Sequence, residues 1–391
     1  MLGYVPQNLL SRCLTGTHHQ LGSEATEATM KLGRQYYMEV GQPQRVNFIA
    51  REHSYHGTTL GALSMSGHVG RRSLYIPLLS DYIHRVSACN SYRQRHIGES
   101  DTAFVNRKAA ELDQKFRDLG PNTVIGFMCE PISGATLGCV PYVPGYLAAM
   151  KAVCTKYGAL FILDEIMCGM GRSGTLHAWQ AEHSDEPGHD CVPDLQTLGK
   201  GLGGGYEPVA AVLIGYKIVN ALKSGSGSFL HGQTYQSHPT TAAAALAVLR
   251  IIKKENLLEN VRKQGAYLSS LLYKKLDSHP YVGDIRGMGL FWAIEFVKDK
   301  KSKEPFDPKL NVANRIHETA VSKKWSMSVY PCQGTADGIR GDHIIIAPAY
   351  NITSGDVELI ATTIEGVIKE VFDTLAKETA DQQNGSVRNG V

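Results

Sequence analysis

The sequence predicts an α/β protein with a mostly parallel central sheet, followed by a smaller α+β domain. Short apolar runs typical of buried strands alternate with stretches of helical spacing up to about residue 279. Beyond Tyr281 the pattern changes to shorter strand-like and helix-like segments. With 391 residues, the chain is long enough to form one large domain and one smaller domain.

The expected elements follow in order along the large domain. A helix is expected over 23–38, with Ser23 as its N-cap and acidic residues in its first turn. The apolar runs predict strands at 45–50, 123–128, 159–163 and 208–214, and the helical spacing predicts helices at 102–119, 146–157, 240–254 and 257–276.

The remaining segments indicate how the domains are divided. Strands and helices are expected to alternate through 289–297, 311–322, 343–347 and 357–377. The predicted organisation is a short N-terminal segment 1–20, a large domain 21–279, a small domain 280–377 and a disordered polar tail 378–391.

Composition argues against several classes of function. The 40 basic and 37 acidic residues nearly balance, so there is no electrostatic reason to expect a nucleic acid or an anionic membrane as partner. No apolar run is long enough to span a bilayer, and the first twenty residues do not resemble a secretory signal. The eight cysteines form no Cys-x-x-Cys pair. We therefore expect a reduced cytoplasmic protein without disulfides.

Asp164 ends the buried apolar run that begins at Ala159. In open α/β sheets, ligands bind at the carboxyl ends of the strands. A carboxylate at that edge is costly unless it meets a cation or strong donor, and a protonated pyridine nitrogen is one such cation. The plain alternative is an aspartate that caps the following turn.

Lys200 follows another short strand and lies in Gly199-Lys-Gly-Leu-Gly-Gly-Gly205. The small neighbouring residues leave room for a planar ring to reach its amine. A lysine in such a place can lower its pKa and act as a nucleophile and proton carrier. The alternative is an ordinary lysine in a surface loop.

Two other kinds of site are disfavoured. Gly169–Gly174 and Gly199–Gly204 both match G-x-G-x-x-G, but neither is followed by the amphipathic helix that a dinucleotide site requires. His53 and His56 are close in sequence, yet no cysteine or acidic cluster accompanies them as further metal ligands.

Three segments could complete an anion and ring site. Gly22 and Ser23 begin the first helix, where free N–H groups favour a phosphate. Thr234 lies in a polar turn before the Ala-rich helix, and Tyr55 and His56 follow a strand. A plain helix cap at Ser23 is the alternative for the first of these segments.

Taken together, these residues resemble the class III aminotransferases, the subgroup-II branch of the fold-type I pyridoxal-phosphate enzymes. The likeness runs from about residue 20 to residue 375. The matching segments, in order, are Gly22-Ser-Glu-Ala-Thr-Glu-Ala28, Ser54-Tyr-His-Gly57, Glu130-Pro131, Asp164-Glu165, Gly169-x-Gly-Arg-x-Gly174, Lys200 in its glycine loop, His231-Gly-x-Thr234 and Arg286-Gly-Met-Gly-Leu290.

The resemblance implies a role for each matched position. Lys200 would hold pyridoxal 5'-phosphate as a Schiff base and move the substrate proton, while Asp164 would pair with the pyridine nitrogen. The other implied cofactor contacts are Tyr55 and Ile166 on the two ring faces, His56 beside Tyr55, Glu130 near the cofactor, Gly22 and Ser23 at the phosphate, and Thr234 at the phosphate of the other subunit of a homodimer.

Three departures from the family pattern stand out. Met167 replaces a glutamine common in ornithine-type and GABA-type members, and Ile345 replaces their substrate-carboxylate arginine. Both changes resemble the omega-transaminase-like branch, in which a mobile arginine binds the keto acid; Arg340 is the candidate here, with a surface-turn residue as the alternative. Only about twenty residues precede the first helix, where the family has several dozen, and Leu21 stands where a serine is usual.

The resemblance implies a ping-pong transfer of an amino group from an amine or omega-amino acid to a keto acid such as pyruvate. Two alternatives remain. Related decarboxylases, aminomutases and epimerases use the same machinery, and a chain without the N-terminal pocket wall could be a non-catalytic scaffold. The identity of the amine is not predicted.

Overall fold

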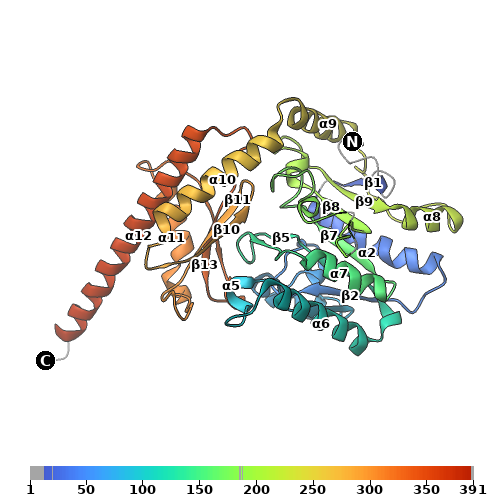
Figure 1. The fold of residues 1–391 in the computed structure, drawn as a ribbon, viewed down its shortest axis with the longest axis horizontal. Helices are drawn as coiled ribbons and strands as arrows, with labels where there is room; N and C mark the ends of the chain where they lie inside the picture. The colour runs from blue at the N-terminus through green and yellow to red at the C-terminus, as the bar shows by residue number, and fades with distance from the viewer. Residues whose placement is uncertain (1–12, 20, 185, 187, 389–391) are drawn as a thin grey trace.

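The large and small sheets come from successive parts of the chain (Figure 1). The computed structural model describes residues 13–19, 21–184, 186 and 188–388. The large sheet has seven strands in the order β1-β9-β8-β7-β4-β2-β3. Their bounds are β1 Cys13–His19, β2 Asn47–Arg51, β3 Ile83–Val86, β4 Val124–Cys129, β7 Leu160–Asp164, β8 Leu195–Leu198 and β9 Ala210–Gly215.

The centre of this sheet is parallel, as predicted, and one side of it is not. β3, β2, β4, β7 and β8 pair in parallel, whereas β9 runs antiparallel to both β8 and β1. Parallel neighbours need a long crossover, usually a helix. Only a loop with a single 3₁₀ turn separates Leu198 from Ala210, so β9 can return directly beside β8 in the opposite direction.

Helices cover both faces of the sheet, which explains the unbroken apolar run of β7. Phe161 and Leu163 pack on the side of α6 (Asp101–Leu119) and α7 (Tyr146–Lys156). Leu160 and Ile162 point to the other side, toward α2 (Gly22–Glu39) and α8 (Tyr216–Ser224). Successive strand residues face opposite sides, so a strand buried on both sides carries apolar residues at every position.

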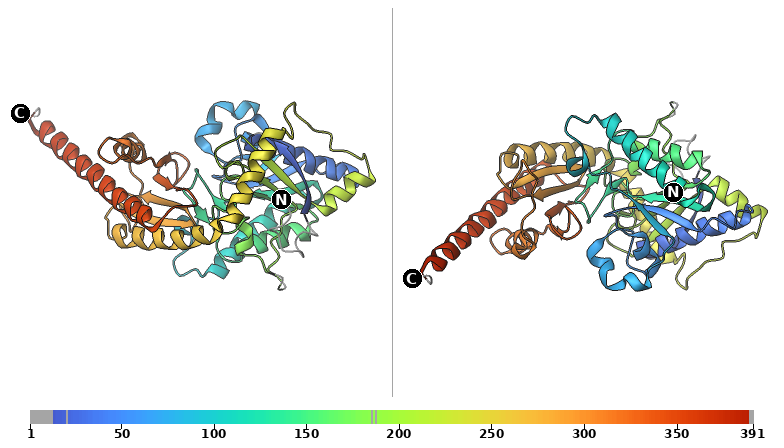
Figure 2. Two further views of the ribbon diagram at one scale, coloured as in Figure 1. Left: turned by 90° about the horizontal axis from the view of Figure 1, so that it is seen from above. Right: turned by 90° about the horizontal axis from the view of Figure 1, so that it is seen from below.

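The small domain is an antiparallel sheet in the order β10-β11-β13-β12, covered by three helices. The strands are β10 Val282–Met288, β11 Phe291–Phe296, β12 Tyr330–Gln333 and β13 Asp342–Ile346. The helices are α10 Leu257–Leu276, α11 Val312–Val321 and α12 Ser354–Arg388, and α9 (Pro239–Lys254) leads into α10. Both views in Figure 2 show the C-terminal part of α12 projecting away from the large sheet.

The remaining elements are short. They are α3 Leu60–Met65, α4 Val69–Arg72, α5 Ser91–Gln94, the two-stranded β5 Ile132–Ser133 and β6 Val140–Pro141, and the 3₁₀ turns Ser73–Leu78, Pro121–Thr123, Ala178–Ala181, Lys200–Leu202 and Pro308–Leu310.

Two expected helix ends differ in the structure. α12 continues to Arg388, through most of the segment in which the sequence predicted a disordered tail. The residue before α2 is Leu21, so Ser23 lies inside the helix and is not its N-cap. The Ser23 hydroxyl instead accepts a hydrogen bond from the Thr58 backbone N–H at 3.0 Å, which ties α2 to the loop after β2.

The cysteines described by the structure, from Cys89 to Cys332, are all free thiols. Within the described ranges, no helix is both long and apolar enough to cross a membrane.

Candidate active site

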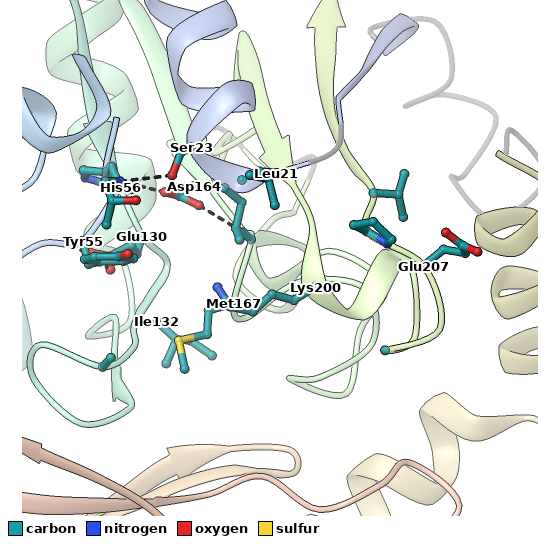
Figure 3. Close-up of a pocket in the computed structure, with 18 of the residues that line it drawn as sticks. Leu21, Ser23, Tyr55, His56, Glu130, Ile132, Asp164, Met167, Lys200 and Glu207 are labelled. Atoms are coloured by element: carbon teal, nitrogen blue, oxygen red, sulfur yellow. Dashed lines mark hydrogen bonds and ion pairs between the residues drawn. The ribbon is translucent and has the colours of Figure 1, made fainter. Parts of the chain in front are cut away.

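A cavity of about 510 Å³ opens at the carboxyl ends of the central parallel strands (Figure 3). Residues that follow β2, β4, β7 and β8 meet there with the first turn of α2. The lining includes Gly22, Ser23, Tyr55, His56, Gly57, Glu130, Ile132, Asp164, Ile166, Met167, Lys200, Glu207 and Val209. Loops at this edge come together because the strands are parallel, so segments far apart in sequence can build one site.

Asp164 is the last residue of β7, and its carboxylate is almost fully buried. Oδ1 accepts hydrogen bonds from the Ile166 backbone N–H at 3.0 Å and from the Thr197 hydroxyl at 3.1 Å. Oδ2 lies 2.7 Å from Nδ1 of His56. The bond to Ile166 caps the turn after β7, as the plain alternative expected, while the bonds to Thr197 and His56 also hold the carboxylate in one orientation inside the cavity.

Lys200 begins the 3₁₀ turn directly after β8, and its side chain reaches into the same cavity (Figure 3). Its φ of +39° lies in the left-handed region, which costs a non-glycine residue about 1–2 kcal/mol and is often found at functional sites. Burial lowers the pKa of the Lys200 amine, and the negative charge of Asp164 opposes that shift. More of the amine is therefore neutral than in a solvent-exposed lysine.

Tyr55 and His56 follow β2, and Glu130 follows β4. Glu130 pairs with the buried Arg51 at 3.3 Å, and its Oε1 accepts a long hydrogen bond from the Tyr55 backbone N–H at 3.4 Å. Burial raises the pKa of Glu130, while the charges of His56 and Arg51 lower it. Glu130 therefore helps to hold the loop that carries Tyr55.

The start of α2 forms a narrow part of the cavity. A Cβ built on Gly57, whose φ is +132°, would lie 2.6 Å from Oγ of Ser23. A Cβ on Gly22 would lie 2.8 Å from Cδ1 of Ile166. Gly57 must be glycine because of its positive φ and its overlap with Ser23, whereas a side chain at Gly22 would require the Ile166 side chain to move. Both glycines keep space open beside the first turn of α2, whose first N–H groups have no backbone acceptor within the helix.

Two predicted site residues do not line this cavity. Thr234 is exposed in the turn before α9, where the neighbouring Gln233 donates to Glu24 of α2 at 2.9 Å. Arg340 is exposed between β12 and β13 and pairs with Asp337 at 2.7 Å. Neither residue contacts Lys200 or Asp164 within the single chain.

The two glycine-rich matches do not form dinucleotide sites. No α-helix directly follows either motif: Gly169–Gly174 leads into turns and the 3₁₀ turn Ala178–Ala181, and Gly199–Gly204 leads through turns into β9. Arg172 of the first motif instead donates to the Leu290 carbonyl at 3.0 Å, and the Leu290 N–H donates to the Arg172 carbonyl at 3.1 Å. This motif attaches the β10–β11 turn to the large domain. Within the described part of the chain, no group of three or more His, Cys, Asp or Glu side chains could hold a metal ion.

Sequence reasoning missed Thr197 and Arg71. Thr197 is the direct partner of Asp164 in the β7–β8 pairing, so knowledge of the strand register would have placed its hydroxyl beside the carboxylate. Arg71 lies on the short helix α4 and lines a second cavity that also reaches Lys200. No local pattern around Arg71 signals that position.

Comparison with known proteins gives a consistent result. The model of the aminotransferase class-III family matches residues 16–367. An aminotransferase of Gibberella zeae is 52% identical over 375 residues, covering 93% of this chain and 72% of that protein.

Two solved structures share the fold. A thermostable (S)-enantioselective omega-transaminase from Thermomicrobium roseum is 33% identical with a TM-score of 0.83, over 91% of this chain and 75% of that one. A PLP-bound amine transaminase from an uncultivated Pseudomonas species is 29% identical with a TM-score of 0.84, over 93% and 79% of the two chains. With its family match and its fold-type I likeness, the chain belongs to the class III aminotransferases, which depend on pyridoxal phosphate.

Proposed function

We propose that this aminotransferase moves an amino group from an amine or omega-amino acid to a keto acid such as pyruvate, in a ping-pong exchange. The observation that carries the proposal is the convergence of the Lys200 amine and the Asp164 carboxylate in one largely buried cavity. Decarboxylation, epimerisation and amino migration by the same residues are the second candidate, because the family likeness alone does not distinguish them.

The residues of the cavity suit pyridoxal phosphate. The cavity has one feature for each part of that molecule. The buried carboxylate suits the pyridine nitrogen, the lysine amine suits the aldehyde, the apolar walls suit the ring faces, and the start of the 18-residue helix α2 suits the phosphate. When bound, the cofactor supplies an aldehyde that takes up the amino group and a ring that withdraws electrons from the substrate carbon.

Lys200 and Asp164 would carry the chemistry. Nζ of Lys200 would bind the cofactor carbonyl carbon and, once released, move the proton between the substrate carbon and the cofactor. The lowered pKa of Lys200 favours the neutral amine that both tasks need. Asp164 would hold a proton on the pyridine nitrogen, since its carboxylate is fixed and its charge is shielded from water.

The other residues would position the cofactor. Tyr55 and Ile166 would cover the two faces of the ring, and Gly22 and Ser23 would bind the phosphate with backbone N–H groups and a hydroxyl. His56 would act through Asp164, which it contacts at 2.7 Å.

Glu130 would act from behind Tyr55, through its ion pair with Arg51 and its contact with the Tyr55 backbone.

The active unit would be a homodimer in the cytoplasm. Thr234 is exposed and could reach the phosphate of a second copy, as the family resemblance implies. Several large apolar side chains of the chain are exposed, including Leu74 at 84%, Leu230 at 71% and Tyr206 at 83%. Surfaces of this kind are covered in oligomers more often than they face water. The free thiols suit a reducing compartment.

The visible absorption spectrum of the purified holoprotein, followed by borohydride reduction and peptide mass mapping, tests the proposal. We expect a yellow protein that loses its colour on reduction and keeps the cofactor mass on the peptide with Lys200. Lys200→Ala should prevent this attachment and lower turnover by about 10³- to 10⁴-fold. Lys263→Ala, at an exposed lysine of α10, is the control and should behave as wild type.

Turnover with a panel of amines separates the remaining candidates. A transaminase requires a keto acid for repeated turnover, so activity without an amino acceptor would support the second candidate. Bound cofactor without turnover of any amine would instead support a non-catalytic scaffold.

A further inference from the structure

A second cavity, of about 940 Å³, extends from Lys200 toward the small domain. It shares Tyr55, Ala135, Met167 and Lys200 with the first cavity, so the two spaces meet at the reactive amine. The rest of its wall comes from α4, α11 and the strands β12 and β13: His68, Arg71, His317, Ser328, Val329, Tyr330, Pro331, Cys332, Gln333, Ile345 and Ala347. A molecule that reaches Lys200 can therefore occupy this second space.

Arg71 places a positive charge on this wall. Its guanidinium carbon lies 5.3 Å from the centre of the Tyr55 ring. Burial raises the pKa of Tyr330, and raises that of Cys332 to about 12, and in both cases the charge of Arg71 opposes the shift. Tyr55 from the loop after β2 and Tyr330 and Cys332 from β12 thus lie near the guanidinium, and all three line the cavity.

No acidic side chain balances this charge. The lining of the second cavity contains no Asp or Glu, and within the described chain Arg71 forms no ion pair. Other arginines differ: Arg51 pairs with Glu130, and Arg286 pairs with both Asp284 and Glu295. The Arg71 side chain has a hydrogen bond with Tyr330 but no acidic partner, and a cation beside a reactive site without a balancing carboxylate is suited to binding an anionic part of the substrate.

Neither the position of the family's substrate arginine, which is Ile345 here, nor the candidate Arg340 supplies an arginine to this cavity. Ile345 lines the same cavity but adds only an apolar surface. Arg340 is bound to Asp337 through both its side chain and its backbone N–H, and it lines neither cavity. Of the two cavities that Lys200 lines in the described part of the chain, the second contains Arg71 and the first contains no arginine.

We propose that Arg71 binds the carboxylate of the substrate, which makes carboxylate-bearing donors and keto acids the preferred substrate class. The proposal rests on the aminotransferase function proposed above. An omega-amino acid carries its amine and its carboxylate at opposite ends, so the amine can meet Lys200 while the carboxylate pairs with the guanidinium. Amines without a carboxylate can still react but gain nothing from Arg71.

The donor half-reaction of the holoenzyme, followed in the cofactor absorption band without any keto acid, tests this assignment. We compare 4-aminobutanoate with 1-aminobutane, which has the same chain length without the carboxylate. Arg71→Gln should lower the apparent second-order rate constant for 4-aminobutanoate about 10- to 100-fold and leave that for 1-aminobutane within about twofold. Arg71→Lys should recover part of the loss. Arg117→Gln, at an exposed arginine of α6, is the control.

A binding measurement is independent of turnover. Butanoate, which has no amine, should bind the wild-type holoenzyme in calorimetry and bind Arg71→Gln about 10- to 100-fold more weakly. Equal losses for both donors would overturn the assignment, because Arg71 would then support the site only structurally. A selective loss in Arg340→Gln with none in Arg71→Gln would overturn it in favour of Arg340. Failure of the wild-type protein to hold cofactor on Lys200 would instead refute the proposed function itself.

Discussion

At the scale of single residues, the environment of Asp164 explains how a buried carboxylate is held in one orientation. Its two oxygens are held by a backbone N–H, a hydroxyl and an imidazole nitrogen. The other imidazole nitrogen of His56, Nε2, is buried and has no hydrogen-bond partner in the described chain. These contacts hold the carboxylate oxygens in place, so the site can stabilise charge that develops during a reaction without rearranging its own groups.

Asp164→Asn should therefore keep the fold and lose the chemistry. We expect kcat/KM to fall about 10²- to 10³-fold, the range found when one fixed electrostatic partner is removed from an active site. Thr197→Val removes only one hydrogen bond to Asp164, so its loss should be about tenfold. Steady-state kinetics with saturating cofactor measure both. A larger loss for Thr197→Val than for Asp164→Asn would contradict this ranking.

The pKa of Lys200 is open to direct measurement in the apoprotein. Burial lowers it below the ordinary value of 10.5, so the neutral amine is formed at lower pH than in an exposed lysine. The rate at which the apoprotein captures pyridoxal phosphate should rise with pH to a plateau, and the midpoint of that rise should lie below pH 10.5. Stopped-flow absorbance over pH 6 to 11 gives that midpoint. A midpoint at or above 10.5 would show that Asp164 outweighs burial.

At the scale of elements, close backbone contacts hold the two domains together. A Cβ on Gly265 of α10 would lie 2.1 Å from the Gly289 carbonyl oxygen in the β10–β11 turn. A Cβ on Gly289, whose φ is +60°, would lie 2.5 Å from the carbonyl carbon of Ser173. Helix, turn and large-domain loop therefore contact one another through glycines, and the motif Gly169–Gly174 serves this contact.

Gly265→Ala should destabilise the protein although alanine is the better helix former. Alanine gains about 1 kcal/mol of helix propensity over glycine, but the overlap with Gly289 forces α10 and the turn apart. We expect a net loss of about 1–3 kcal/mol in the free energy of unfolding. Gly355→Ala is the matched control, because its Cβ would meet only Oγ1 of Thr353, at 3.8 Å, in the exposed first turn of α12. Denaturant unfolding should show the control equal to wild type or more stable by up to about 1 kcal/mol.

At the scale of the whole molecule, the proposed homodimer would let Thr234 of one subunit take part in the site of the other. Thr234 lines neither cavity of its own chain. In a twofold dimer each subunit can complete the site of the other, since the same surface is used twice. This makes the proposed dimer testable by activity as well as by mass.

Mixed dimers of two inactive variants should regain activity. Lys200→Ala lacks the amine, and Thr234→Glu should repel the phosphate of the partner site. A dimer of one copy of each has one site with both native residues, so random pairing should restore about one quarter of the wild-type activity. Co-expression with two affinity tags provides the mixture, and analytical ultracentrifugation confirms its mass. No recovery in a verified mixed dimer would contradict the role of Thr234 across the interface.

Most elements could be predicted because their patterns are local. The alternation of apolar runs with amphipathic stretches placed the core strands and the helices of the large domain within a few residues, and α10 was predicted to the residue. The edge strands β1, β3, β10 and β12 were not predicted. β3 and β12 are short and partly exposed, which leaves a weaker apolar pattern. The antiparallel direction of β9 follows from the short loop that connects it to β8 and not from the residues of β9 itself.

The sequence by itself determined the family and its cofactor, and it predicted Lys200 and Asp164 as site residues because each lies in a distinctive local segment at the end of a strand. Only the tertiary structure decided which further side chains join them. The position of Thr197 beside Asp164 depends on strand register, and the position of Arg71 depends on how α4 packs over Tyr55. The loop between β12 and β13 keeps Arg340 away from both cavities. Contacts between segments distant in sequence are set by packing of the whole chain, and no local pattern records them.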